Sequence, residues 1–318
     1  GSSGGSGAAV AANFGTIGLG TDTGNSIRGP SSHCGLVGFR STLGLTSRSG
    51  IIPLYLRNDV AGPMCRTVED ATRVLEVIAG YDPDDPVTSH ARGKVPEDYT
   101  RFLKKDGLKG ARIGVLRVLS ENDPDPEMKA LFEKALGDMD SLGATIISRV
   151  DVPGFDSLRQ NQWCSDFRQD IETYLQKYVK SDTMQTLEDI IRVGSNSEYV
   201  TQRLNYFANH SGRSDHPEVE CLDPYRDARR IAFRDALAQR MDALELYAIV
   251  YPTWNPIPAK IDSFQAGCRG DNSQIIAPQT GQPASTIPMG YTRGHLPAGI
   301  QFLGRMFDEP TLISLTYA

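Results

Sequence analysis

Two short apolar segments flank one amphipathic helix in the middle of the chain, and this pattern limits the possible folds more than any other feature. Residues 111–116 and 144–149 are mostly apolar and partly β-branched, as in buried strands. Between them, apolar side chains recur at helical spacing at Met128, Leu131, Phe132, Leu136, Met139 and Leu142. Strands joined through one helix normally lie parallel, with a right-handed crossover. The pattern therefore predicts an α/β fold.

Further strand patterns predict a larger sheet around this unit. Residues 247–251 form an apolar run that stops at Pro252, and residues 14–20, 285–289 and 298–303 also read as strands. We expect α/β architecture with a mixed central β-sheet and helices on both faces. The expected organisation is a single domain over residues 1–318, with a catalytic segment (1–80), a mostly helical middle (81–245) and returning strands (246–318).

Capping residues mark where several helices begin. Thr67, with Asp70 three residues later, predicts the start of a helix that Gly80 ends. Asp223 and Pro224 read as the N-cap and first residue of another helix. Residues 310–315 begin a last helix that the end of the chain cuts short.

Composition excludes several functional classes. The chain has 318 residues, a net charge of −6 and no basic cluster, so nucleic acid is not an expected partner. No apolar run reaches the ~18 residues that a membrane span needs. The cysteines are odd in number and widely spaced, which predicts no disulfide framework and a reducing compartment, the cytoplasm; they are Cys34, Cys65, Cys164, Cys221 and Cys268.

The segment from Gly20 to Arg28 is the richest in residues that could carry chemistry. It can be a plain turn between strands, the default for a Gly/Asp/Asn cluster. It contains the Asp-Thr-Gly triplet of aspartic proteases, but the chain has no second triplet to form their dyad. It lacks the Gly-Lys-Ser/Thr of a phosphate loop. In the fourth interpretation, Ser26 is a nucleophile and the preceding main-chain N–H groups form an oxyanion hole.

The N-terminal residues also admit two interpretations. Residues 1–7 are only Gly and Ser, as in an expression linker. A small-residue helix at 8–12 and the strand at 14–20 follow directly, however, and then a second Gly-rich turn. A linker would not need a matching turn at that position, so we expect residues 1–7 to be part of the fold.

Both turns together resemble the defining motif of the amidase signature family. Gly-Ser-Ser-Gly-Gly-Ser at residues 1–6 and Gly-Thr-Asp-Thr-Gly-Asn-Ser-Ile-Arg at 20–28 place Ser2 and Ser26 24 positions apart (26 − 2). The similarity covers both ends of the chain and is looser in the helical middle. It continues at residues 34–39, 44–47, 50–53, 59–64, 281–290, 296–301 and 304.

The resemblance implies roles for individual residues. Ser26 would be the nucleophile, and Ser2, at an unusual cis peptide bond, would relay its proton. A cis bond without proline costs about 2.5–4 kcal/mol, so the fold must hold it. The main-chain N–H groups of Thr23, Gly24, Asn25 and Ser26 would form the oxyanion hole, while Asp22 and Arg28 would brace the loop. The implied reaction is hydrolysis of a small-molecule amide through an acyl-enzyme, without metal or cofactor.

Two departures from the family pattern affect this interpretation. Asn25 replaces the usual Gly, a change that the turn can tolerate because Asn adopts positive φ more readily than most residues. No lysine here matches the family's general base, so we expect a fragment truncated at both ends that lacks normal amidase activity alone. A non-catalytic scaffold, an amidotransferase subunit with partner chains, and a homo-oligomer stay open.

Three weaker candidate groups remain. His33 lies seven residues after Ser26 and could form a Ser-His pair, although closeness in sequence says little about geometry. A polar loop contains metal-ligand residue types in no known zinc spacing; they are His210, Asp215, His216, Glu218 and Cys221. Aromatic side chains of the helical middle could line a pocket but at helical spacing are more often core; they are Trp163, Phe167, Tyr174 and Tyr206.

Overall fold

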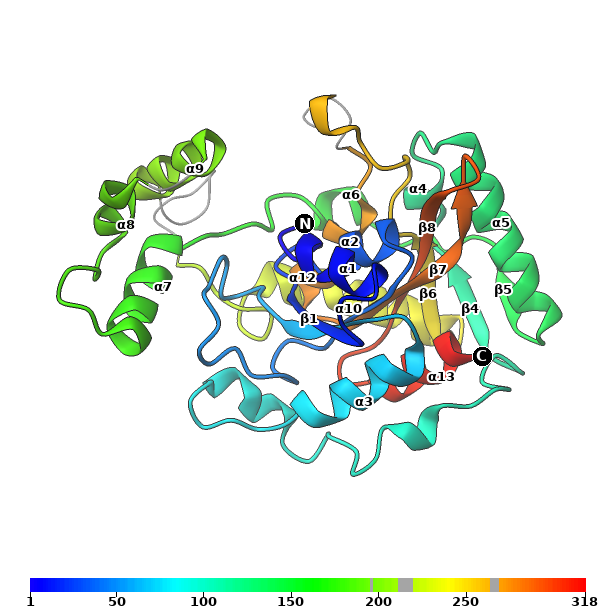
Figure 1. The fold of residues 1–318 in the computed structure, drawn as a ribbon. Coiled ribbons are helices and arrows are strands. Elements are labelled where there is room, and N and C mark those ends of the chain that lie inside the picture. Colours follow the sequence, from blue (N-terminus) through cyan, green and yellow to red (C-terminus); the bar gives the residue numbers. More distant parts are fainter. Residues whose placement is uncertain (195–196, 211–219, 264–268) are drawn as a thin grey trace.

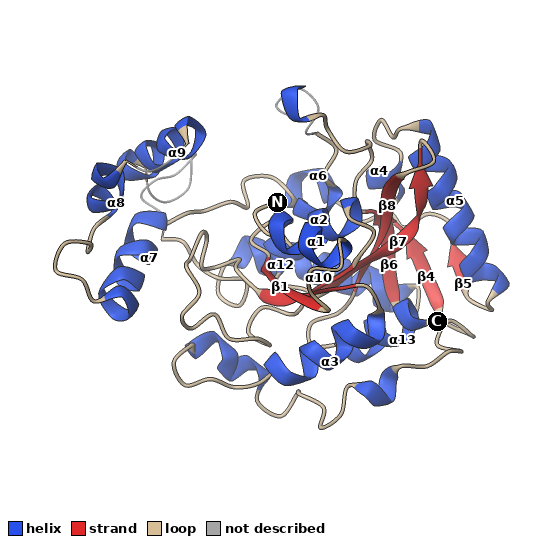
Figure 2. Cartoon of the chain, viewed as in Figure 1, coloured by secondary structure: helices blue, strands red, loops and turns tan. Residues whose placement is uncertain are grey.

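A single mixed sheet organises the chain in the computed structural model, which describes residues 1–194, 197–210, 220–263 and 269–318 (Figures 1 and 2). Its spatial order is β1-β3-β2-β7-β8-β6-β4-β5. The strands are β1 (Ile17–Thr21), β2 (Val37–Arg40), β3 (Ala61–Cys65), β4 (Arg112–Val115), β5 (Thr145–Ile147), β6 (Ala248–Pro252), β7 (Ala284–Thr292) and β8 (Leu296–Leu303).

The predicted β-α-β unit lies at one end of this sheet. β4 is parallel to β5, with Ile113 opposite Ile146, and parallel to β6 on its other side. The remaining pairs are antiparallel, including the long β7–β8 hairpin. The expected mixed sheet is therefore confirmed.

The helices include most of those that the sequence predicts. They are α1 (Gly4–Ala11), α2 (Arg28–His33), α3 (Val68–Ile78), α4 (Arg117–Ser120), α5 (Pro126–Ser141), α6 (Phe155–Leu158), α7 (Phe167–Tyr174), α8 (Leu187–Val193), α9 (Glu198–Asn209), α10 (Ala228–Ala243), α12 (Ala277–Thr280) and α13 (Glu309–Tyr317). Short 3₁₀ or π turns are η1 (Pro86–Ala91), η2 (Thr100–Phe102), η3 (Leu175–Val179), η4 (Ile261–Ser263) and η5 (Asn272–Gln274).

Side chains of β6 alternate between two apolar layers, because successive residues of a strand point to opposite faces. Ala248 and Val250 belong to a core with side chains of α3, α5 and α13. Ile249 and Tyr251 belong to a second core with side chains of α4, α6, α10 and α12. Helices therefore cover both faces of the sheet, as expected.

The Gly/Ser-rich N-terminus is part of the fold. Gly4–Ala11 forms α1, which packs beside β1 and α2 near the centre of Figure 1. β1 begins at Ile17, three residues later than Phe14, because Asn13 adopts a φ of 62° and the chain turns there. The expression-linker interpretation of residues 1–7 is therefore wrong.

Helices α7, α8 and α9 extend away from the sheet, at the left of Figure 1. We call residues 164–221 the helical excursion. It has an apolar core of its own, formed by Phe167, Ile171, Leu175, Leu187, Leu204 and Phe207. A disulfide between Cys164 and Cys221 joins its two ends, with the Cα atoms 5.4 Å apart.

This disulfide corrects the prediction from cysteine spacing. The two cysteines are 57 positions apart in sequence, and only folding brings them together. Cys34 and Cys65 are free among the described residues, and Cys268 lies outside them. The inference from cysteine spacing to a reducing compartment thus loses its basis, and a cytoplasmic location stays a prediction.

The helix expected from Asp223 and Pro224 begins later, so that prediction is wrong in its boundary. Asp223 caps a single turn by accepting the N–H of Tyr225 at 2.9 Å. Asp227 then takes an extended conformation (φ −75°, ψ 112°), and its carboxylate caps α10 through the N–H of Arg229. The extended residue interrupts the helix, and α10 therefore starts at Ala228.

Candidate active site

The turn from Asp22 to Ser26 joins the end of β1 to the start of α2. The N–H of Asp22 donates to the Val60 carbonyl at 2.8 Å, which anchors the turn. Its carboxylate accepts the N–H groups of Ile27 and Arg28 at 3.2 and 3.3 Å. Ser26 is therefore held immediately before α2 and is only 7% exposed.

Two buried arginines fix Asp22. Arg28 lies 3.0 Å and Arg40 3.1 Å from its carboxylate, and all three side chains are fully buried. Burial alone would raise the pKa of Asp22, but the two guanidinium groups outweigh it and hold the pKa at about 2. Arg28 also donates to the Gly24 carbonyl at 2.8 Å and to Gln301 at 2.9 Å. These contacts join Asp22 and Arg28 to the turn, and their bracing role stays a prediction.

The first Ser-rich turn reaches the second. The main-chain N–H of Ser2 donates to Ser26 Oγ at 3.1 Å, although the residues are 24 positions apart. Ser3 Oγ exchanges hydrogen bonds with the N–H and carbonyl of Thr21 at 3.1 and 3.2 Å. A Cβ on Gly1 would lie 2.6 Å from Ser26 Cα, so only glycine permits this approach. The expected meeting of the two turns is therefore present.

The cis peptide bond expected at Ser2 is absent, since no cis bond occurs among the described residues. The trans form avoids the cost of about 2.5–4 kcal/mol of a non-proline cis bond. Ser3 makes both contacts with Thr21 in this form. Ser2 is exposed and meets Ser26 through its main-chain N–H, whereas the predicted relay would use its hydroxyl.

Side chains and carbonyls of the expected oxyanion loop form hydrogen bonds with other groups of the protein. Thr23 Oγ1 donates to Asp59 at 2.5 Å, and Asn25 Nδ2 donates to Asp271 at 2.5 Å. By contrast, no protein group of the described residues accepts the main-chain N–H groups of residues 23–26. Main-chain donors without a protein partner can receive the negative charge that develops on a carbonyl oxygen.

One side of the turn faces Trp163 and Gln274. A Cβ on Gly24 would lie 3.1 Å from the Trp163 ring and 3.5 Å from Gln274 Oε1. Trp163 is 37% exposed and packs against Tyr55 with ring centroids 5.5 Å apart. The Gly24 carbonyl accepts a hydrogen bond from Arg28, whose side chain is fully buried.

The other predicted aromatic candidates lie elsewhere. Phe167 is buried in the core of the helical excursion, and Tyr174 packs against that core. Tyr206 is 45% exposed and stacks on His210 at 4.3 Å. Of the aromatic candidates, only Trp163 contacts the Gly24 turn through a described contact.

His33 lies at the far end of α2 from Ser26. Its ring stacks on Trp254, with centroids 4.8 Å apart, and burial lowers its pKa to about 4. No hydrogen bond between described residues joins it to Ser26. The geometry therefore gives the Ser-His hypothesis no support.

Metal-ligating groups do not gather in the part of the chain that is described. There, no three His, Cys, Asp or Glu side chains lie close enough to hold a metal ion. Of the polar candidates at 210–221, Cys221 is consumed by the disulfide, and Asp215, His216 and Glu218 lie outside the described residues. Within the same limits, no helix combines the length and apolar character needed to cross a bilayer.

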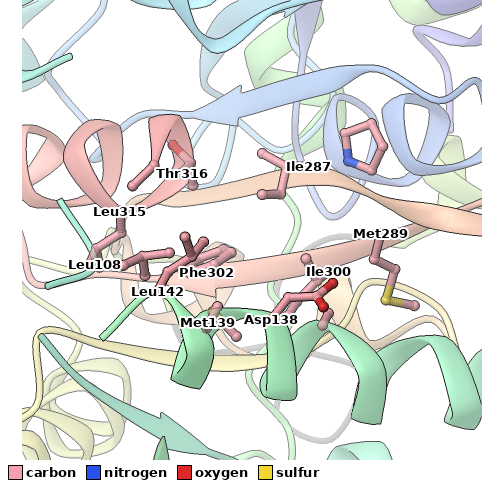
Figure 3. A pocket seen from close by; sticks show the side chains of 13 residues that line it. Leu108, Asp138, Met139, Leu142, Ile287, Met289, Ile300, Phe302, Leu315 and Thr316 are labelled. Carbon is pink, nitrogen blue, oxygen red and sulfur yellow. The ribbon is translucent and has the colours of Figure 1, made fainter. Parts of the chain in front are cut away.

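A hollow of about 230 Å³ lies away from this site, between α5, α13 and the β7–β8 hairpin (Figure 3). Its lining is mostly apolar and includes Met139, Ile287, Phe302 and Leu315. None of the predicted site residues lines it.

The sequence analysis did not identify three residues that lie next to the site. Asp59 lies within a segment that resembles the family, so its position carried some signal. Asp271 and Gln274 lie in no recognised motif, and their contacts with Asn25 and Gly24 arise only from folding. Sequence alone offered no sign of either.

Comparisons with known proteins show which proteins this chain is similar to. A family model described as Amidase matches residues 1–313. A probable amidase of Arabidopsis thaliana is 32% identical over 326 residues, covering 100% of this chain and 59% of that protein. The A subunit of glutamyl-tRNA(Gln) amidotransferase from Thermosynechococcus vestitus is 31% identical over 347 residues, covering 100% of this chain and 66% of that protein.

A solved structure shows the same fold. Native peptide amidase from Stenotrophomonas maltophilia superposes with a TM-score of 0.80 at 32% identity, covering 100% of this chain and 64% of that one. The chain thus spans about 60% to two thirds of the length of these relatives. Because the family model matches nearly all of it, the chain belongs to the amidase signature family of hydrolases acting on carbon–nitrogen bonds.

Proposed function

We propose that the protein containing this chain hydrolyses carboxylic amides to an acid and ammonia or an amine, with Ser26 as nucleophile. One observation carries the proposal: the main-chain N–H groups of residues 23–26, in the turn that carries the Ser26 hydroxyl, have no acceptor among the described residues. A tetrahedral intermediate formed on Ser26 would place its negative oxygen against such donors. Removing one donor of this kind typically costs about 10²–10³ in rate.

The surrounding contacts support the same reaction. The Asp22 ion pairs and the Thr23–Asp59 hydrogen bond fix the loop before substrate arrives. Fixed donors need no reorganisation as charge develops. Ser26 Oγ would attack the carbonyl carbon and form an acyl-enzyme, which water would then hydrolyse.

Ser26 must lose its proton during attack, because a neutral serine hydroxyl is a poor nucleophile. We propose that the Ser2 hydroxyl relays this proton, after a rotation that brings it to Ser26, and later helps to protonate the leaving nitrogen. No lysine of this chain matches the general base expected for the family. The proposal therefore concerns the whole protein, and we expect these 318 residues alone to lack normal amidase activity.

The test uses a fluorophosphonate, which labels activated serines, and a panel of amides with the full-length protein. We expect labelling at Ser26 and its loss, together with amide hydrolysis, in Ser26→Ala. Ser141→Ala is a matched control, because Ser141 is exposed at the end of α5 and bonds only its own helix in the described contacts. Undiminished labelling or hydrolysis in Ser26→Ala would show that another residue is the nucleophile.

A second candidate function comes from the relatives. One of them, 31% identical, is the glutamyl-tRNA(Gln) amidotransferase component described above. We propose as the alternative that the protein acts in such an assembly with partner chains. Stable co-purification with other subunits would favour this role, and full activity of the isolated protein on small amides would count against it.

A further inference from the structure

Asp271 accepts four hydrogen bonds beside the nucleophile turn. Its Oδ1 accepts the N–H and the hydroxyl of Ser273 at 3.0 and 2.5 Å. Its Oδ2 accepts Gln274 Nε2 at 2.7 Å and Asn25 Nδ2 at 2.5 Å. Burial raises the pKa of Asp271, while these donors and the charge of Arg28 favour the ionised form. Both oxygens act as acceptors here, as in a carboxylate.

This acceptor fixes the orientation of Asn25. A carboxylate cannot donate a hydrogen bond, so the NH₂ group of Asn25 must face Asp271. The carbonyl oxygen of the same amide then faces the nucleophile, with Asn25 Oδ1 3.4 Å from Ser26 Oγ. Ser26 Oγ also accepts the Ser2 N–H at 3.1 Å. The hydroxyl thus lies between one donor and one acceptor.

The space around Asn25 suits this side chain. A Cβ on Gly1 would lie 3.1 Å from Asn25 Oδ1, and one on Gly29 would lie 3.3 Å from Asn25 Nδ2. Glycines on both sides therefore leave room for the amide. The family pattern has Gly where this chain has Asn25, and a glycine could make neither contact.

We propose that Asn25 and Asp271 are a positioning pair for the nucleophile. Asp271 holds the Asn25 amide, and the Asn25 carbonyl oxygen accepts the Ser26 hydroxyl and sets its direction before attack. The pair transfers no proton, because an amide does not titrate in this range; the Ser26 hydrogen turns from Asn25 Oδ1 to the Ser2 hydroxyl when it leaves during attack. The inference rests on the proposed function and adds to it a residue 246 positions away in sequence.

A double-mutant cycle in the full-length protein tests whether Asp271 acts through Asn25. The variants are Asp271→Asn, Asn25→Gly and their combination, each assayed for kcat and KM on one amide. An Asn at 271 can donate as well as accept, so Asn25 can rotate and present its NH₂ group to Ser26. We expect Asp271→Asn to lower kcat roughly tenfold, with KM changed less than twofold, because only the direction of the hydroxyl is lost.

Non-additivity is the deciding result. In the Asn25→Gly background, Asp271→Asn should change kcat by less than twofold, because the residue through which it acts is gone. A tenfold loss in both backgrounds, or no loss in either, would overturn the inference. Asp125→Asn is the matched control, because Asp125 caps α5 as Asp271 caps η5, and it should leave kcat unchanged.

Failure of the two proposals can be told apart. If Ser26→Ala retains hydrolysis, the proposed function is wrong and the positioning pair is overturned with it. If Ser26→Ala is inactive while the cycle is additive, only the positioning pair is overturned. Thermal unfolding of each variant separates a loss of kcat from a loss of folded protein.

Discussion

Removing the Cys164–Cys221 disulfide should loosen the helical excursion and leave the sheet intact. The bond closes a loop of 57 residues, for which the chain-entropy estimate gives about 4 kcal/mol at 25 °C. The excursion has its own apolar core, so the cross-link restricts mainly the unfolded form of that part. Arg57, which lies outside the helical excursion, also holds it in place. It donates to the Cys221 carbonyl at 3.2 Å and to Asp170 at 2.5 Å.

Amide hydrogen exchange read by mass spectrometry can measure this effect segment by segment. In Cys164→Ser/Cys221→Ser, peptides from α9 should exchange up to about 10³-fold faster, because each 1.4 kcal/mol is a factor of ten. Peptides from β6, buried between both layers of helices, should keep their rates. Cys34→Ser/Cys65→Ser is the control, since neither thiol forms a disulfide among the described residues. Unchanged exchange in α9, or equal acceleration in β6, would refute the view of a locally acting cross-link.

Three further predictions concern the nucleophile turn. Asp22→Ala leaves buried Arg28 and Arg40 without their counter-charge and should cost about 3–5 kcal/mol in urea unfolding. The pKa of Asp22 is about 2 in the folded protein and 3.8 in the unfolded chain, so the unfolded chain binds the proton first as pH falls. About 2 kcal/mol of stability, complete above about pH 5, should therefore disappear as the pH falls through the folded pKa, and Asp22→Asn should remove this dependence. Gly24→Ala would bring a methyl group to 3.1 Å from the Trp163 ring and should raise KM several-fold, an effect that Trp163→Ala in the same chain should reverse.

Local sequence patterns predicted the strands and helices of the sheet, because the spacing of apolar residues indicates which side chains are buried. The alternating side chains of residues 248–251 enter two different cores, and the helix of residues 126–141 connects parallel strands, as its spacing indicated. Thr67 caps α3 through the N–H of Asp70 at 3.0 Å. Such features depend on neighbours within a few residues, so they can be predicted from the sequence.

Other features depend on segments that meet only after folding. Cys164 and Cys221 looked unrelated because the excursion that reunites them has no sequence signature. The start of α10 was misplaced because two Asp residues four positions apart can both cap a turn, and the extended conformation of Asp227 decides between them. The meeting of Ser2 with Ser26 was predictable only through the family resemblance, since spacing alone does not bring two turns together.

The family pattern does not explain Asn25, but the contacts of this residue in the structure do. Compared with the family pattern, an Asn in place of Gly beside a nucleophile is a local conflict, since it adds volume and two polar groups to a tight turn. Conflicts of this kind persist where the rest of the fold compensates them. Here, Asp271 accepts the amide NH₂ group, Ser26 meets the amide oxygen, and Gly1 and Gly29 leave the space. Because these partners come from distant parts of the chain, Asn25→Gly alone would leave the partly buried Asp271 short of a donor. The family residue should therefore be less favourable at this position than the residue that replaced it.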